Sequence, residues 1–279
     1  MPSRLMPLSR GLWSVLVLAL TLWAAPLRAE AAQLARLLQT DALFEILARE
    51  GAVYGEELAG ELFEVGSDPA WRAQVAAIND PARLRPLFDA AFAAALQGAP
   101  TGPITAFLDG DLGHRVVTLE IEARRALLDP AVDDRARALF ETALAGDDPR
   151  AAAVLEFITA ADLLEPNVAG GLNANLAFYR ALVAGGGFPY AVSEQDMLAD
   201  VRAQEPEVRA EMQGWLGAYL FMAYGPLSDA ELQAYRGFAA SQAGRQLTLA
   251  LFAGFDIVFQ RVSWDLGAAT AQRLSGQDL

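Results

Sequence analysis

The chain has 279 residues, of which 21 are basic and 35 acidic, with one histidine, no cysteine and a formal net charge of −14 at pH 7. The absence of cysteine excludes disulfides, a thiol nucleophile and a cysteine-ligated zinc site, and the absence of lysine excludes Schiff-base chemistry. Nucleic acid and anionic lipid surfaces are poor partners, because an acidic protein as a whole repels them.

The first 29 residues are typical of an export signal. Arg4 and Arg10 precede the apolar run Leu12–Trp23, and small residues follow as far as Ala29. This order predicts cleavage after Ala29 and a periplasmic protein, and the alternative is an uncleaved membrane anchor. After residue 29 we expect no membrane span, because no uninterrupted apolar run reaches the roughly 18 residues that a span needs.

The rest of the chain predicts an all-α, multi-helix bundle of about eleven to thirteen helices, since alternating β-branched segments are nearly absent. Four Asp-Pro pairs place a capping carboxylate before a proline suited to the first helical turn. These pairs begin at Asp68, Asp80, Asp129 and Asp148, and a further start is predicted at Ser193. Glycines predict helix ends at Gly51, Gly98, Gly146, Gly185–Gly187 and Gly225.

The longest helix is predicted over 244–271. Its apolar residues step by three or four positions along one face, which we expect to be buried. They are Leu247, Leu251, Phe255, Val258, Val262 and Leu266. The aromatic segment 215–222 is predicted to pack nearby as core.

The chain also resembles itself. At an offset of 131 residues, Phe107 and Gly113 match Phe238 and Gly244, each pair six residues apart. We therefore predict two helical units, 30–150 and 151–279, as degenerate tandem copies of one unit. The alternative is a chance match between alanine-rich helices.

The C-terminal unit carries a recognisable string. Leu227–Leu232 reads LSDAEL, and Phe238, Ser241 and Gly244 follow it. This pattern resembles domain-of-unknown-function family 2059, a family of exported bacterial helical proteins, although the family has an aromatic residue before the serine and a proline after it. The resemblance implies export, helices and an envelope setting, and it carries over no catalytic residue.

The residues of this string predict a structural motif. Ser228 and Glu231 have the spacing of a capping box, in which each satisfies the backbone amide of the other. Phe238 would anchor the capped helix in the core, Ser241 would cap a helix junction, and Gly244 would permit a left-handed or crowded backbone. The alternative is a binding role for Ser241 with Arg245.

No catalytic, cofactor-binding or metal-ligating residue is predicted. His114 is the only histidine, so a metal site with two histidines is impossible, and its position suggests a surface residue. Carboxylate pairs are available for acid catalysis, for example Asp109 with Asp111 and Glu120 with Glu122.

The function expected from the sequence is therefore binding of an envelope protein or of a small ligand, without a cofactor. The alternative is an acid-dependent hydrolase of the cell envelope that uses paired carboxylates. Two carboxylates facing one cleft, one of them desolvated, would favour the enzyme, whereas an apolar groove would favour binding.

Overall fold

The computed structural model describes residues 28–64, 66–188 and 191–277. Of the described residues, 84% are helical and none is in a strand, which confirms the all-α prediction. Most of the predicted export signal, residues 1–27, lies outside the described residues, and the predicted cleavage point after Ala29 lies in a helical stretch over 28–37.

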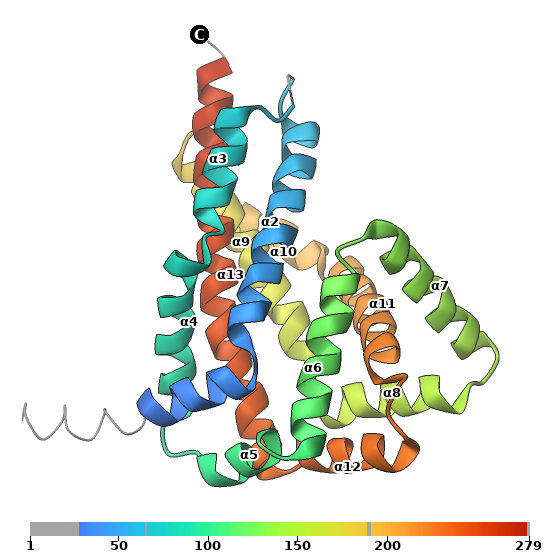
Figure 1. Cartoon of the computed structure of the whole chain (residues 1–279). Helices are drawn as coiled ribbons and strands as arrows, with labels where there is room; N and C mark the ends of the chain where they lie inside the picture. The colour runs from blue at the N-terminus through green and yellow to red at the C-terminus, as the bar shows by residue number, and fades with distance from the viewer. Residues whose placement is uncertain (1–27, 65, 189–190, 278–279) are drawn as a thin grey trace, which may run out of the picture.

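Twelve further helices follow this stretch within the described residues (Figure 1). The first six are α2 (Thr40–Leu62), α3 (Pro69–Ile78), α4 (Pro81–Ala95), α5 (Thr101–Leu108), α6 (Asp111–Ala126) and α7 (Pro130–Ala145). The last six are α8 (Pro149–Ala160), α9 (Leu164–Ala184), α10 (Glu194–Ala203), α11 (Glu205–Tyr224), α12 (Asp229–Ala239) and α13 (Gln242–Gln277).

The predicted helix starts are confirmed. The side chains of Asp68, Asp80, Asp129 and Asp148 each accept a hydrogen bond from a backbone N–H in the first turn of α3, α4, α7 and α8. Ser193 begins α10 with a capping box. These side chains satisfy amide groups that have no partner within the helix, which is why the spacing in the sequence sets where each helix begins.

The helix end predicted at Gly51 is wrong, because α2 continues to Leu62. A Cβ atom at Gly51 would lie 2.3 Å from Oδ1 of Asn79, and one at Gly55 would lie 2.6 Å from Cγ1 of Val75. Both glycines therefore allow α3 and the residue that follows it to lie close against α2, and neither ends the helix.

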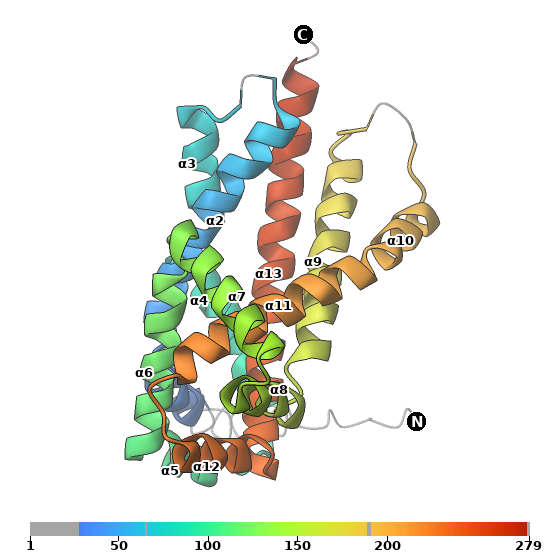
Figure 2. The same cartoon turned by 90° about the vertical axis from the view of Figure 1, so that its right-hand side faces the viewer.

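Helix α13 is the longest element, as predicted, and it packs along α4 and α9 (Figures 1 and 2). Within the described residues, α13 is also the one helix whose length and composition would allow it to cross a membrane. Of its most apolar 18-residue stretch, 22% is buried inside the protein. The sequence predicts no such segment, because no uninterrupted apolar run after residue 29 reaches the roughly 18 residues that a span needs.

The apolar stripe of α13 is not uniformly buried. Leu247, Val258 and Leu266 are buried, whereas Leu251, Phe255 and Val262 are half-buried. The aromatic segment 215–222 also departs from the prediction, since Trp215, Tyr219 and Phe221 pack with α6, α7 and α8 in a second cluster. A cavity, described below, lies between α13 and this cluster.

The two predicted units share their hydrophobic cores. One cluster combines residues 31–121 with α13, and the other combines α6, α7 and α8 with α11 and α12. Helix α4 packs on α13, and α6 packs on α11, so each unit is completed by a helix of the other. The boundary predicted between residues 150 and 151 falls in the first turn of α8.

The residues that match at an offset of 131 occupy equivalent places. Gly113 follows the α5–α6 turn and Gly244 the α12–α13 turn, and α5 and α12 lie together at the base of the molecule (Figures 1 and 2). The rings of Phe107 and Phe238 stack with their centroids 3.7 Å apart and their planes 5° apart. The internal repeat stays a prediction, and the similar geometry of the α5–α6 and α12–α13 junctions supports it.

Both junction glycines are required by close contact. A Cβ atom at Gly113 would lie 2.0 Å from the carbonyl oxygen of Phe107, and one at Gly244 would lie 2.1 Å from that of Phe238. We expect Gly113→Ala and Gly244→Ala each to lower the free energy of unfolding by about 1–3 kcal/mol, because the backbone must shift. Urea denaturation followed by circular dichroism measures the change.

Gly237→Ala is the matched control. Gly237 is exposed within α12, and a Cβ atom there would meet nothing within 4 Å. Alanine at this position should stabilise the protein by about 0.5–1 kcal/mol through helix propensity. Equal effects at all three positions would contradict the contact argument.

Candidate functional site

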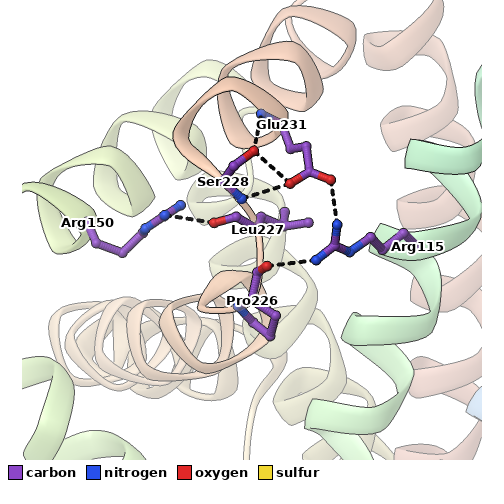
Figure 3. Close-up of polar contacts among 6 residues, drawn as sticks. All are labelled: Arg115, Arg150, Pro226, Leu227, Ser228 and Glu231. Carbon is purple, nitrogen blue, oxygen red and sulfur yellow. Dashed lines mark hydrogen bonds and ion pairs between the residues drawn. The ribbon is translucent and has the colours of Figure 1, made fainter.

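The predicted capping box at Ser228 is formed (Figure 3). The Ser228 hydroxyl accepts a hydrogen bond from the Glu231 amide at 3.3 Å, and the Ser228 amide donates to Oε2 of Glu231 at 2.8 Å. Hydrogen bonds from the Ser228 hydroxyl and amide, together with nearby Arg115, hold the pKa of the Glu231 carboxyl below its usual value. The box fixes the start of α12.

Two arginines hold the turn that leads into this box (Figure 3). Arg115 on α6 donates to Oε1 of Glu231 at 2.6 Å and to the carbonyl oxygen of Pro226 at 2.7 Å. Arg150 on α8 donates to the carbonyl oxygen of Leu227 at 2.7 Å. The motif residues thus use their polar groups on one another and on the backbone, which is a structural arrangement.

The rest of the motif forms the α12–α13 junction. The Ser241 hydroxyl accepts a hydrogen bond from the Gly244 amide at 3.1 Å, and Phe238 stacks on Phe107. Arg245 is exposed and donates to the carbonyl oxygen of Ala240. The need for glycine at 244 comes from crowding against α12, one of the two reasons that the sequence suggested.

The carboxylate pairs suggested by the sequence do not come together around a cleft. Asp109, Asp111 and Glu122 are exposed, and His114 is exposed in the first turns of α6. Glu120 differs from the other three acids because it is half-buried and lines an internal cavity. Among the described residues, no group of three or more histidine, aspartate or glutamate side chains is arranged to hold a metal ion.

The cavity lies at the centre of the helical assembly and has a volume of about 920 Å³. Its walls come chiefly from α2, α6, α9, α11 and α13, and Phe107 and Phe238 also line it. Tyr54 and Glu211 are exposed and also line it, so the cavity reaches the protein surface. Its volume lies within the range of small-molecule sites, roughly 300–1,000 Å³.

The cavity walls are mostly apolar. Leu43 and Leu47 of α2 contribute to one side, and α13 contributes Leu251, Phe255 and Val262. These are the residues of the α13 stripe that are half-buried, so their accessible surface belongs to the cavity wall. Large apolar side chains with surface inside a protein are typical of a ligand site, because a packed core would have covered them.

Glu120 is held by tyrosines. The hydroxyl of Tyr224 on α11 donates to Oε1 of Glu120 at 2.7 Å, and that of Tyr235 on α12 donates to the same oxygen at 3.0 Å. The Tyr219 hydroxyl donates to the Glu120 carbonyl oxygen at 3.2 Å. Burial raises the pKa of the Glu120 carboxyl, and the two hydroxyl bonds to Oε1 reduce that rise.

One turn further along α6, Arg124 forms a two-fold pair with Glu50 of α2. Nε of Arg124 lies 2.9 Å from Oε1 of Glu50, and Nη2 lies 2.9 Å from Oε2. The guanidinium carbon also lies 5.3 Å from the centre of the Trp215 ring. This pair satisfies both charges inside the protein and joins α2 to α6 beside the cavity.

Sequence reasoning named Glu120 as one acid among many but did not find the cavity. The signal available was an acid on a helix with Arg124 one turn later, between apolar positions such as Val117 and Ile121. That pattern is common on exposed helices. The tyrosines that bind Glu120 are about a hundred residues away in the chain, so the local sequence could not reveal the cluster.

No protein-family model, curated protein or solved structure matches the chain.

The raised pKa of Glu120 predicts a pH-dependent stability. In the unfolded chain the Glu120 carboxyl has a pKa of about 4.3 and loses its proton above that pH, whereas the folded protein keeps the proton to a higher pH. The free energy of unfolding therefore falls as pH rises through this range. We expect the difference in unfolding free energy between wild type and Glu120→Gln to decrease from pH 4 to pH 8. Urea denaturation at several pH values measures this difference.

Glu122→Gln provides the control, since Glu122 is exposed on the same helix. The difference in unfolding free energy between wild type and Glu122→Gln should not decrease with pH in this way. A wild-type advantage over Glu120→Gln that grows as pH rises would mean that the fold stabilises the charged carboxylate, contrary to the expectation.

Proposed function

We propose that this chain is an exported binding protein whose central cavity holds an apolar small molecule. The observation that carries the proposal is the cavity of about 920 Å³, lined by half-buried apolar and aromatic side chains together with a few polar groups. Ligand sites in proteins share this combination, in which apolar walls supply affinity and a few polar groups fix orientation. The export part rests on the pattern of the first 29 residues.

Binding accounts for the packing better than a purely structural role does. Trp215, Phe255 and Val262 each bring apolar area to the wall and leave part of it accessible. Covering such area is favourable at about 25 cal/mol per Å², so an apolar ligand gains free energy by filling the cavity. Without a ligand, this apolar area of the cavity wall stays uncovered by the packing of the helices.

The second candidate function is acid-dependent hydrolysis, which one observation favours. Glu120 is a carboxyl group with a raised pKa in an apolar cavity, the environment that suits a general acid. A hydrolase of this kind also needs a second carboxylate free to act on water or substrate. Glu50 lines the same cavity, but both of its oxygens accept hydrogen bonds from Arg124. Binding is therefore the better supported function.

The neutral fluorescent probe N-phenyl-1-naphthylamine tests the cavity. We expect saturable binding with one site per chain, and a fluorescence increase as the probe leaves water. Ala174 lines the cavity from α9, so Ala174→Phe should place a ring inside it and weaken binding about tenfold or more, or about 1.4 kcal/mol. Fluorescence titration measures both affinities.

Ala234→Phe is the control, because Ala234 is exposed on α12 and does not line the cavity. It should bind the probe as wild type does. Absence of saturable binding to wild type, or equal loss in both variants, would overturn the proposed function.

A further inference from the structure

Resting on the proposed function, we infer that the ligand is a cationic amphiphile, an apolar chain that ends in an ammonium group. Its head would bind the Glu120 carboxylate between Tyr224, Tyr235 and the cavity. Its chain would lie along the apolar residues of α13.

The cavity wall is acidic. Four carboxylates line it, from Glu50, Glu120, Glu211 and Asp256, and the basic group among its described residues is Arg124. The wall therefore carries a formal charge of −3 within a protein whose net charge is −14. An anionic ligand would enter against this field, whereas a cation would be attracted.

Two of these carboxylates already have arginine partners. Glu50 is bound by Arg124 through both oxygens, and Oε1 of Glu211 lies 2.8 Å from Nη2 of Arg137. Asp256 accepts amide hydrogen bonds on both oxygens, from Asn173 at 3.2 Å and Gln260 at 2.6 Å. Of the four, Glu120 is left with neither an arginine partner nor hydrogen-bond donors on both of its oxygens.

Both tyrosine hydroxyls that bind the Glu120 side chain donate to Oε1. Within the described part of the chain, Oε2 has neither a hydrogen-bond donor nor a basic side chain at ion-pair distance. A half-buried carboxylate without a cation is costly, because burial removes water without replacing its charge stabilisation. A ligand ammonium would supply both the missing donor and the missing charge.

The aromatic side chains around Glu120 also suit a cation. The rings of Tyr224 and Tyr235 lie 5.7 Å apart at 86°, and Trp215 stacks on Tyr219 at 5.0 Å. Aromatic faces attract ammonium groups through their quadrupole. The same wall already holds one cation this way, since Arg124 lies over the Trp215 ring.

Three ten-carbon compounds that differ in the head group test the inference: decylamine, decanol and decanoate. Each would displace N-phenyl-1-naphthylamine from the full chain at pH 7.5, below its micellar concentration. We expect decylamine to bind about tenfold or more tightly than decanol, and decanoate to bind more weakly than either. Glu120→Gln should bring decylamine to the affinity of decanol, whereas Glu122→Gln should change neither affinity.

The outcomes separate the inference from the proposed function. Displacement by decanol with no advantage for decylamine would overturn the ammonium assignment and leave the cavity as a binding site. Tightest binding of decanoate would overturn it as well, and would indicate Arg124 as the anchor. An amine advantage that survives in Glu120→Gln would remove Glu120 from the site. Failure of the naphthylamine probe itself to bind would instead reject the proposed function.

Discussion

The stacking of Phe107 on Phe238 joins the two halves of the chain, and most of the structure depends on it. Phe107 lies near the end of α5, which leads into α6, and Phe238 lies near the end of α12, which leads into α13. In each case a glycine in the first turn of the longer helix lets that helix lie against the short helix before it. Phe107 also packs against both of the larger hydrophobic clusters. The junction therefore fixes where α6 and α13 begin, and how far apart they stand above it.

The cavity follows from this separation. Helix α13 packs on α4 and α9, whereas α6 packs on α11, so the apolar faces of the two long helices are not pressed against each other. Side chains such as Leu251 and Phe255 consequently pack against the core on one side and line the cavity on the other. The Arg124–Glu50 pair and the tyrosines on Glu120 satisfy polar groups that would otherwise be unpaired beside this space. Apolar walls and fixed polar groups thus arise from one arrangement.

The sequence predicted the features that depend on neighbours in the chain. The Asp-Pro starts and the Ser228 capping box involve residues within three positions of each other, and the structure contains them. The helix end predicted at Gly51 was wrong because this glycine is needed for close contact with Asn79. Asn79 is distant in the sequence, so no local pattern shows the contact. The stripe of α13 was recognised, but its partial exposure was not, since exposure depends on which helices stand opposite. The Glu120 cluster was beyond local reasoning for the same reason.

The position of α13 also has a consequence for how the chain folds. Its partners include residues synthesised early, for Arg83 pairs with Asp265 and Arg273 with Asp68, contacts that span 182 and 205 residues. A ribosome-bound chain that lacks α13 leaves uncovered the surfaces of α4 and α9 that pack on α13. Contacts of such sequence separation form slowly, because the long loop must close before they are made. The fold is therefore completed only once α13 has been synthesised, and until then the chain is open to chaperones and to aggregation.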